Sequence, residues 1–128
     1  MLTFLQANLK AITVLDSLAA AIVLTQTAQG TSPICGSSKS MKMGLGWQIP
    51  NMQQQMFYKN GATSLGGFSC AVEFAPEANF GIAVLTNQFP NKTAGANPST
   101  LAAAIRKLLN AGLPDTAHPF ETGEDERN

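Results

Sequence analysis

The sequence predicts an α+β fold: an antiparallel sheet of three to four strands, a C-terminal helix packed on it, and two N-terminal helices nearby. Three observations predict this class. Four short segments between positions 44 and 87 carry the apolar patterns typical of strands. Apolar residues recur at helical spacing at both ends of the chain. The length of 128 residues suits one domain of ordinary size.

Two helices are predicted at the N-terminus, over residues 1–10 and 15–28. Asp16 or Ser17 can accept hydrogen bonds from the free amides of the second helix. The apolar stripes expected to face the core are Leu2, Leu5 and Leu9 in the first helix and Leu18, Ala21 and Ile22 in the second. Residues 29–42 are polar, serine-rich and punctuated by glycine and proline, so they predict a loop.

The four predicted strands cover residues 44–49, 56–61, 68–74 and 80–87, with Trp47 expected in the core. Segment 68–74 alternates strictly and places Glu73 on its more polar side, so we expect this carboxylate in solvent. Segment 80–87 is apolar on both faces, which predicts burial on both sides. The short connection "PEAN" between these two segments suits a hairpin.

The C-terminal helix has clear boundary signals. Asn97 is a suitable N-cap and Pro98 suits the first helical position. Gly112 ends the helix. Its apolar stripe is expected to comprise Leu101, Ile105, Leu108 and Leu109. The sequence therefore predicts an ordered segment over residues 1–112 and an acidic, disordered tail over residues 113–128.

Composition and charge exclude several classes of function. The formal net charge is 0, and charged residues are only 12% of the chain. Residues 1–112 hold seven Lys/Arg and three Asp/Glu, a net +4 without a basic cluster, so nothing favours nucleic acid as a partner. Cys35, Cys70 and His118 do not have the spacing of a zinc site. One disulfide is possible, and two free thiols are the favoured interpretation.

No membrane span is predicted. The longest uninterrupted apolar run, residues 18–24, is much shorter than the roughly 20 residues that a spanning helix needs. Asp16 interrupts the apolar stretch that could otherwise be read as part of an export signal. We therefore expect no signal peptide in this chain, which as it stands would be expressed in the cytoplasm.

The segment Lys59-Asn60-Gly61-Ala62 is the strongest candidate for chemistry. A lysine on a strand can attract a substrate carboxylate or lower the pKa of a nucleophile. The strand beyond it can offer a backbone N–H to a developing oxyanion. The alternative interpretation is an exposed lysine near a turn.

The surrounding motifs favour the first interpretation. "MGLGWQI", "YKNGAT", "GGFSCAVEFAPEANFGIAVLTNQFPN" and a final Ala/Leu-rich helix follow in an order that resembles the C-terminal part of the class C β-lactamase family, with its serine-esterase and penicillin-binding relatives. "MLTFLQANL" and "LAAAIVLTQ" are similar to the helices that precede the family's Gly-Leu-Gly-Trp strand. The resemblance covers roughly residues 1–112 and implies a partial β-lactamase/transpeptidase-like fold.

The resemblance also implies roles for individual residues. Lys59, Asn60 and Gly61 occupy the positions of the family's Lys-Thr-Gly element, with Asn60 in place of threonine. Lys59 would be the electrostatic residue, and Ala62 would give one oxyanion-hole N–H. Asn60, Gly61 and Asn91 would contact the substrate, a β-lactam or an ester. The resemblance implies no metal or organic cofactor, and it implies a periplasmic location.

The family's nucleophile motif, Ser-x-x-Lys, is absent, because no serine here has a lysine three positions later. Tyr58-Lys59-Asn60 matches the letters of the family's Tyr-x-Asn motif but overlaps the Lys-x-Gly strand, so Tyr58 is interpreted as a packed aromatic. The resulting hypothesis is the C-terminal fragment of a serine hydrolase that works through an acyl-serine, is inactive alone and needs a missing N-terminal part. The alternative is a non-catalytic module that self-associates through its sheet as a dimer.

Overall fold

The computed structural model describes residues 1–33, 40–50, 55–62, 67–87 and 97–109 of the chain. These residues form three helices and one six-stranded antiparallel sheet, with a short 3-10 turn before the last strand. The predicted α+β class and the three helices are confirmed, whereas the prediction of three to four strands is too low. The elements are α1 (Leu2–Lys10), α2 (Ser17–Gln26), β1 (Gly30–Pro33), β2 (Ser40–Met43), β3 (Gln48–Ile49), β4 (Phe57–Ala62), β5 (Ser69–Ala75), η1 (Pro76–Ala78), β6 (Phe80–Thr86) and α3 (Pro98–Leu108).

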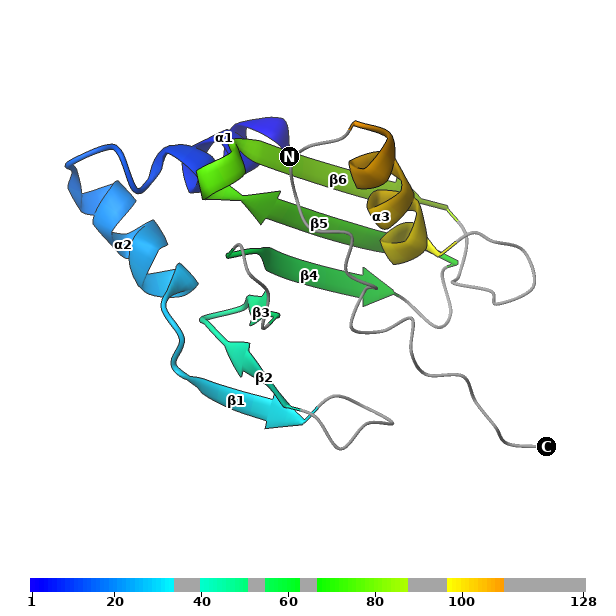
Figure 1. The fold of residues 1–128 in the computed structure, drawn as a ribbon, viewed down its shortest axis with the longest axis horizontal. Coiled ribbons are helices and arrows are strands. Elements are labelled where there is room, and N and C mark those ends of the chain that lie inside the picture. Colours follow the sequence, from blue (N-terminus) through cyan, green and yellow to red (C-terminus); the bar gives the residue numbers. More distant parts are fainter. Residues whose placement is uncertain (34–39, 51–54, 63–66, 88–96, 110–128) are drawn as a thin grey trace.

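The strands lie in the sheet in the same order as in the sequence, from β1 to β6 (Figure 1). The longest ladders join β4 to β5 and β5 to β6. The two-residue strand β3 meets β4 at a single pair, Gln48 opposite Tyr58. The sheet is therefore broad and continuous across β4–β6 and much narrower where it passes through β3.

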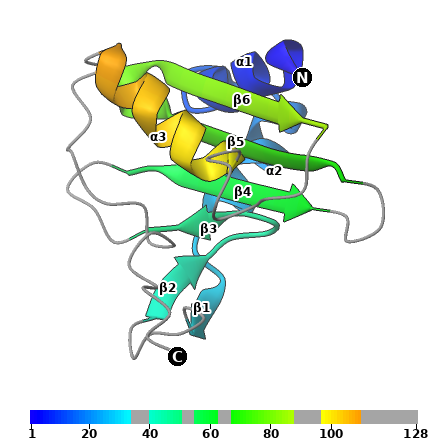
Figure 2. The same ribbon diagram turned by 90° about the vertical axis from the view of Figure 1, so that its right-hand side faces the viewer.

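The helices lie on two sides of this sheet (Figure 2). α3 crosses one face over β5 and β6, and α1 packs on the other face against the same two strands. α2 packs mainly against α1 rather than on the sheet. The described residues therefore form a three-layer arrangement, helix on sheet on helix, at the β4–β6 end.

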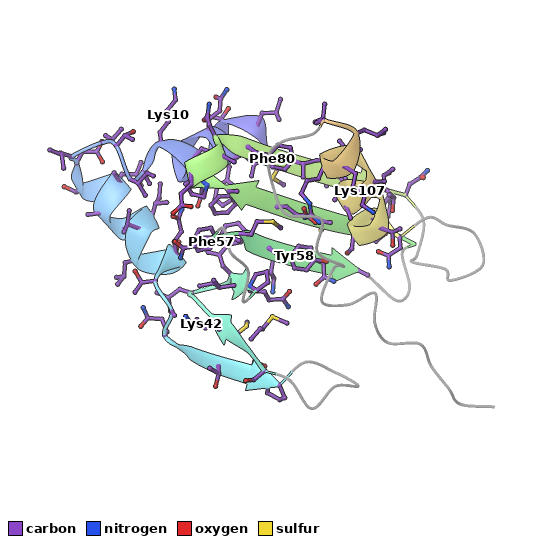
Figure 3. All side chains as sticks on the ribbon, in the orientation of Figure 1. Lys10, Lys42, Phe57, Tyr58, Phe80 and Lys107 are labelled. Carbon is purple, nitrogen blue, oxygen red and sulfur yellow. The ribbon has the colours of Figure 1, made fainter. Side chains whose placement is uncertain are left out.

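Two apolar cores follow from the alternation of side chains along β4 and β5. On the α1 side, Leu5, Trp47 and Phe57 pack with Ile49, Val72 and Phe74. On the α3 side, the core comprises Tyr58, Ala71, Val84 and Ala102. Consecutive residues of β4 therefore enter opposite cores, as Phe57 and Tyr58 do (Figure 3). Burial of Trp47 and packing of Tyr58 are confirmed.

The start of α3 is confirmed, but its predicted apolar stripe is confirmed only in part, since Ile105 packs against the core on the α3 side and the three leucines do not. The side chain of Asn97 accepts from the Ser99 amide at 2.9 Å, and Pro98 is the first helical residue. The face on the sheet carries Pro98, Ser99, Ala102 and Arg106, whereas Leu101, Leu108 and Leu109 are exposed. Small residues let the helix approach the sheet closely, and the arginine finds a buried partner there, so residue size and pairing decided which face turned inward.

The N-terminal stripes are only partly confirmed. Leu5 is buried and Leu9 is half-buried, but Leu2 is exposed. In α2 the buried residues are Ala19 and Gln26, while the predicted stripe of Leu18, Ala21 and Ile22 lies largely outside. Asp16 is the N-cap of α2 as expected and accepts from the Ala19 amide at 2.7 Å. This helix is apolar on all sides, so periodicity alone could not identify the side that packs.

Three strand predictions also need correction. Of the strand predicted over residues 44–49, only Gln48 and Ile49 form a strand, β3. The predicted loop over residues 29–42 contains β1 and β2, an antiparallel pair whose register places Thr31 opposite Lys42. Polar short strands give a weak apolar signal and were therefore missed. β6 is not buried on both sides, because it is the last strand of the sheet and only Val84 along it is buried. The strand buried on both faces is β5.

In the part of the chain described above, no helix is both long and apolar enough to cross a bilayer. The predicted tail over residues 113–128 lies outside the described residues, as do Cys35 and His118. Cys70 is described, and it is a free thiol.

Candidate functional site

Four consecutive residues of β4, Lys59 to Ala62, form the candidate site. All four are exposed, in contrast to Phe57 and Tyr58 at the start of the same strand. On one edge they pair with β5, from Lys59 opposite Val72 to Ala62 opposite Ser69. On the other edge, β3 ends its pairing at Tyr58. Among the described residues, no strand covers this second edge of Lys59–Ala62.

An open edge has direct chemical consequences. In an antiparallel ladder, alternate residues direct their N–H and C=O groups toward one neighbour, and the residues between them direct theirs to the other side. Two of the four residues therefore present backbone donors and acceptors to the uncovered edge of β4. Such groups are fixed by the sheet, and fixed N–H groups are what an acyl-transfer site uses to bind an oxyanion.

The side chains of the four residues alternate between the two faces of the sheet. Lys59 and Gly61 lie on the α1 side, because they are opposite Val72 and Cys70. Asn60 and Ala62 lie on the α3 side, together with Tyr58. In the described part of the chain Lys59 makes no ion pair, so its ammonium is available to an anionic group.

An apolar hollow of about 550 Å³ lies beside the site, at the end of the β4–β5 hairpin. It is lined by Gly61, Ala62, Phe68, Ser69, Cys70, Leu85 and Thr86. A Cβ atom at Gly61 would lie 3.5 Å from the sulfur of Cys70, which is ordinary van der Waals contact. The packing therefore does not require glycine at position 61. The lack of a side chain there does leave the backbone of β4 accessible from the hollow.

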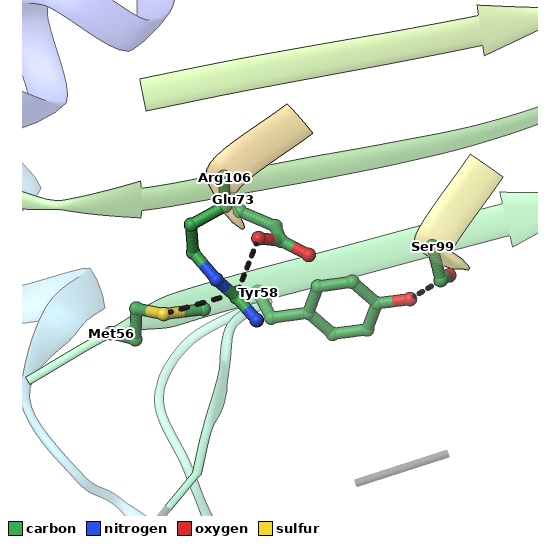
Figure 4. Close-up of polar contacts among 5 residues, drawn as sticks. All are labelled: Met56, Tyr58, Glu73, Ser99 and Arg106. Carbon is green, nitrogen blue, oxygen red and sulfur yellow. Dashed lines mark hydrogen bonds and ion pairs between the residues drawn. The ribbon is translucent and has the colours of Figure 1, made fainter. Parts of the chain in front are cut away.

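A cluster of buried polar side chains lies between α3 and strands β4 and β5 (Figure 4). The hydroxyl of Tyr58 forms a hydrogen bond with the hydroxyl of Ser99 on the first turn of α3. Nη1 of Arg106 donates to Oε2 of Glu73 at 2.8 Å and also contacts the sulfur of Met56. The first turn of α3 is thus hydrogen-bonded to β4, and its last turn is hydrogen-bonded to β5.

The expectation that Glu73 is solvated is wrong, since the side chain is completely buried and paired with Arg106. Because β5 lies inside the sheet and α3 covers it, a position that alternation assigns to the polar face is here an interior position. One sequence signal could have indicated the pair. Arg106 follows Ser99 and Ala102 at helical spacing and therefore lies on the same face of α3 as these small residues.

Tyr58 is not a general base at neutral pH. Burial raises the pKa of its phenol to about 12, the nearby Glu73 carboxylate adds to the increase, and the Ser99 hydrogen bond partly opposes it. A neutral phenol fixed beneath a helix cannot accept a proton from a nucleophile on the other side of a cleft. This agrees with the interpretation of Tyr58 as a packed aromatic.

The structure brings Lys59, Asn60, Gly61 and Ala62 together on one strand and one open edge, whereas Asn91 lies outside the described residues. Two described serines are engaged with other hydroxyls: Ser69 with Thr86 at 2.6 Å, and Ser99 with Tyr58. Neither of these partners is a base. Within the described ranges, no three His, Cys, Asp or Glu side chains gather as metal ligands.

Comparison with known proteins gives no family for this chain. No protein-family model matches the sequence. No curated protein matches it at a significant level.

Proposed function

We propose that this chain supplies the Lys-x-Gly wall of a class C β-lactamase-like serine hydrolase, and that a separate N-terminal part supplies the nucleophile. The substrate class is a β-lactam or an ester, which reacts through an acyl-serine. The resemblance of the ordered motifs supports this proposal, and so does the α+β arrangement in which β4, the strand of Lys59 to Ala62, lies between β3 and β5 of an antiparallel sheet.

The observation that carries the proposal is the uncovered edge of β4. Pairing with β3 stops at Tyr58, immediately before the four exposed residues that the resemblance assigns to the site. A strand with unpaired N–H and C=O groups normally needs a cover. A substrate lying along this edge, with the missing part of the fold beyond it, would provide one.

In this proposal Lys59 attracts the substrate carboxylate or stabilises the charge that develops at the nucleophile. Ala62 donates its backbone N–H to the oxyanion, and Asn60, Gly61 and Asn91 contact the substrate. The buried contacts of Tyr58 and Glu73 with α3 keep β4 in place, so that the backbone donors need little reorganisation during the reaction. No step requires a metal or an organic cofactor.

Complementation tests the proposal. The chain is mixed with the N-terminal part of a β-lactamase-like relative that contains Ser-x-x-Lys, and hydrolysis of a chromogenic ester is measured. If activity appears, Lys59→Ala should lower kcat by roughly 10²–10³, the loss seen when one oxyanion-site donor is removed. Lys42→Ala is the matched control, because Lys42 is also an exposed lysine on a strand of this sheet.

Two results would contradict the proposal. One is no recovery of activity with several relatives, although a complex forms. The other is equal rates for wild type, Lys59→Ala and Lys42→Ala in an active complex, which would remove Lys59 from the site.

A second candidate is a non-catalytic module that self-associates through its sheet. The exposed Phe68 and Leu85 beside the 550 Å³ hollow favour it. Leu85→Asp should then weaken self-association in sedimentation experiments, while a complemented hydrolase should retain its dependence on Lys59. The two candidates are therefore separated by which substitution has an effect, and in which assay.

A further inference from the structure

The apolar residues that follow α1 create a second exposed surface, which shares no residue with the candidate site. We call the α2 surface the set formed by Ile12, Val14, Leu15, Val23 and Leu24, all of which are exposed. Figure 1 shows α2 at one end of the sheet, beyond the ends of the long strands. The side of α2 that is covered holds Ala19 and Gln26, and Gln26 donates to Asn8 of α1.

α2 has the composition of an interior helix. Its ten residues, SLAAAIVLTQ, include no charged side chain. A helix that is apolar on all sides is normally buried on all sides. In the described residues α2 packs mainly against α1, so most of its circumference has no cover.

The α2 surface has both a hollow and a projection. A hollow of about 830 Å³ lies between residues 11–16 and α2, and its lining includes Ala11, Ala20 and Val23. Leu15 belongs to the same lining and is fully exposed, with a relative accessibility of 104%. A surface that carries both a knob and a hole can pack against its own copy around a two-fold axis.

We propose that a second copy of this chain docks on the α2 surface, with Leu15 of each copy in the hollow of the other. Few charges oppose such a contact, because Asp16 is the one charged residue in the lining of the hollow and its carboxylate already caps α2. A lipid surface is disfavoured, because interfacial helices carry several Lys or Arg on their polar face and α2 carries none.

The exposed area sets the expected strength. The exposed fractions of the five residues add up to about three fully exposed residues, on the order of 300 Å² of apolar side-chain surface per copy. A standard interface buries roughly 800 Å² per partner, somewhat more than half of it apolar. The α2 surface therefore provides more than half of the apolar area of a stable dimer, and we expect a weak dimer with a Kd in the micromolar range.

The test is sedimentation equilibrium of the full chain from about 1 to 500 μM. We expect a monomer–dimer equilibrium, with Kd raised at least tenfold by Leu15→Asp. Leu18→Asp is the matched control: Leu18 is 68% exposed on the same helix, but about 160° around the axis from Ala20 in the hollow. Circular dichroism of each variant establishes that it remains folded.

A monomer at every concentration would overturn the proposal. A dimer that Leu18→Asp weakens as much as Leu15→Asp would also overturn it. The same holds for a dimer that Leu85→Asp weakens and Leu15→Asp does not, since the contact would then lie elsewhere. Two further outcomes would also overturn it by giving the surface another occupant. In the first, the monomer binds neutral phosphatidylcholine vesicles and Leu15→Asp abolishes the binding. In the second, the monomer binds a supplied N-terminal part and Leu15→Asp abolishes that binding. The inference does not rest on the hydrolase proposal, whose test uses Lys59 and ester turnover.

Discussion

Replacement of Arg106 by methionine should destabilise the fold more than a methionine substitution on the exposed side of α3. The side chain of Arg106 is 6% exposed, and the side chain of Glu73, whose carboxylate it contacts at 2.8 Å, is 0% exposed. Methionine fills much of the volume of the arginine stem, so the main effect is the loss of the charge partner rather than a cavity. Glu73 then keeps its buried charge but loses its ion pair with Arg106.

Removing one member of a buried ion pair costs about 3–5 kcal/mol. A small domain has roughly 5–15 kcal/mol of total stability, so Arg106→Met should remove about a fifth of it or more. With a urea m-value of about 2 kcal/mol/M, the midpoint should fall by about 2 M. The assay is urea unfolding followed by circular dichroism at low micromolar concentration, where a weak dimer is dissociated.

Two further variants test whether the ion pair holds α3 on the sheet. The double variant Glu73→Leu/Arg106→Met removes both charges and should recover most of the loss, because a buried pair can be replaced by apolar residues with little net cost. Lys107→Met, on the exposed side of the same helix, should change stability by less than about 0.5 kcal/mol. If Arg106→Met costs less than about 1 kcal/mol, or the double variant is no more stable than the single one, the pair does not hold α3 on the sheet.

Tyr58 is the sole tyrosine, so absorbance near 295 nm should show its phenol titrating near pH 12. Because this pKa is raised above the unfolded value of 10, the free energy of unfolding should fall by about 2–3 kcal/mol between pH 10 and 12. The variant Tyr58→Phe should abolish that fall. Gly44→Ala should cost about 1–3 kcal/mol in urea unfolding, since its Cβ would lie 2.3 Å from the Thr25 carbonyl oxygen, whereas Gly30→Ala, with open space, should have little effect. The isolated chain, incubated with a reactive penicillin, should show no acyl adduct by intact-mass analysis; a stable adduct on any serine would contradict the absence of an activated nucleophile.

The local signals in the sequence were strong where they depend on one or two residues. The Asn97–Pro98 start of α3 and the Asp16 cap of α2 are set by side-chain-to-backbone hydrogen bonds within a few residues, so neighbouring sequence is enough to predict them. β5 and β6 were located to within a residue or two by their apolar patterns. β1 and β2 were missed, because polar strands are held by their partners rather than by their own composition.

The candidate site divides in the same way. Lys59, Asn60, Gly61 and Ala62 could be predicted as one group, because adjacent residues on a strand must lie side by side. The exposure of the group and the open edge beside it could not be predicted, since both depend on where β3 stops pairing. The roles assigned to these residues remain predictions, and Asn91 lies outside the described residues.

By itself, the sequence determined the α+β class, the two helix caps and the position of the Lys-x-Gly strand, all of which depend on contacts between neighbours in the chain. Only the tertiary structure decided that Glu73 is buried, which side of α3 packs inward, and how much of α2 is left without a cover. The physical reason is that burial depends on what another element covers. Residues as far apart as Glu73 and Arg106 meet only when α3 lies on the sheet.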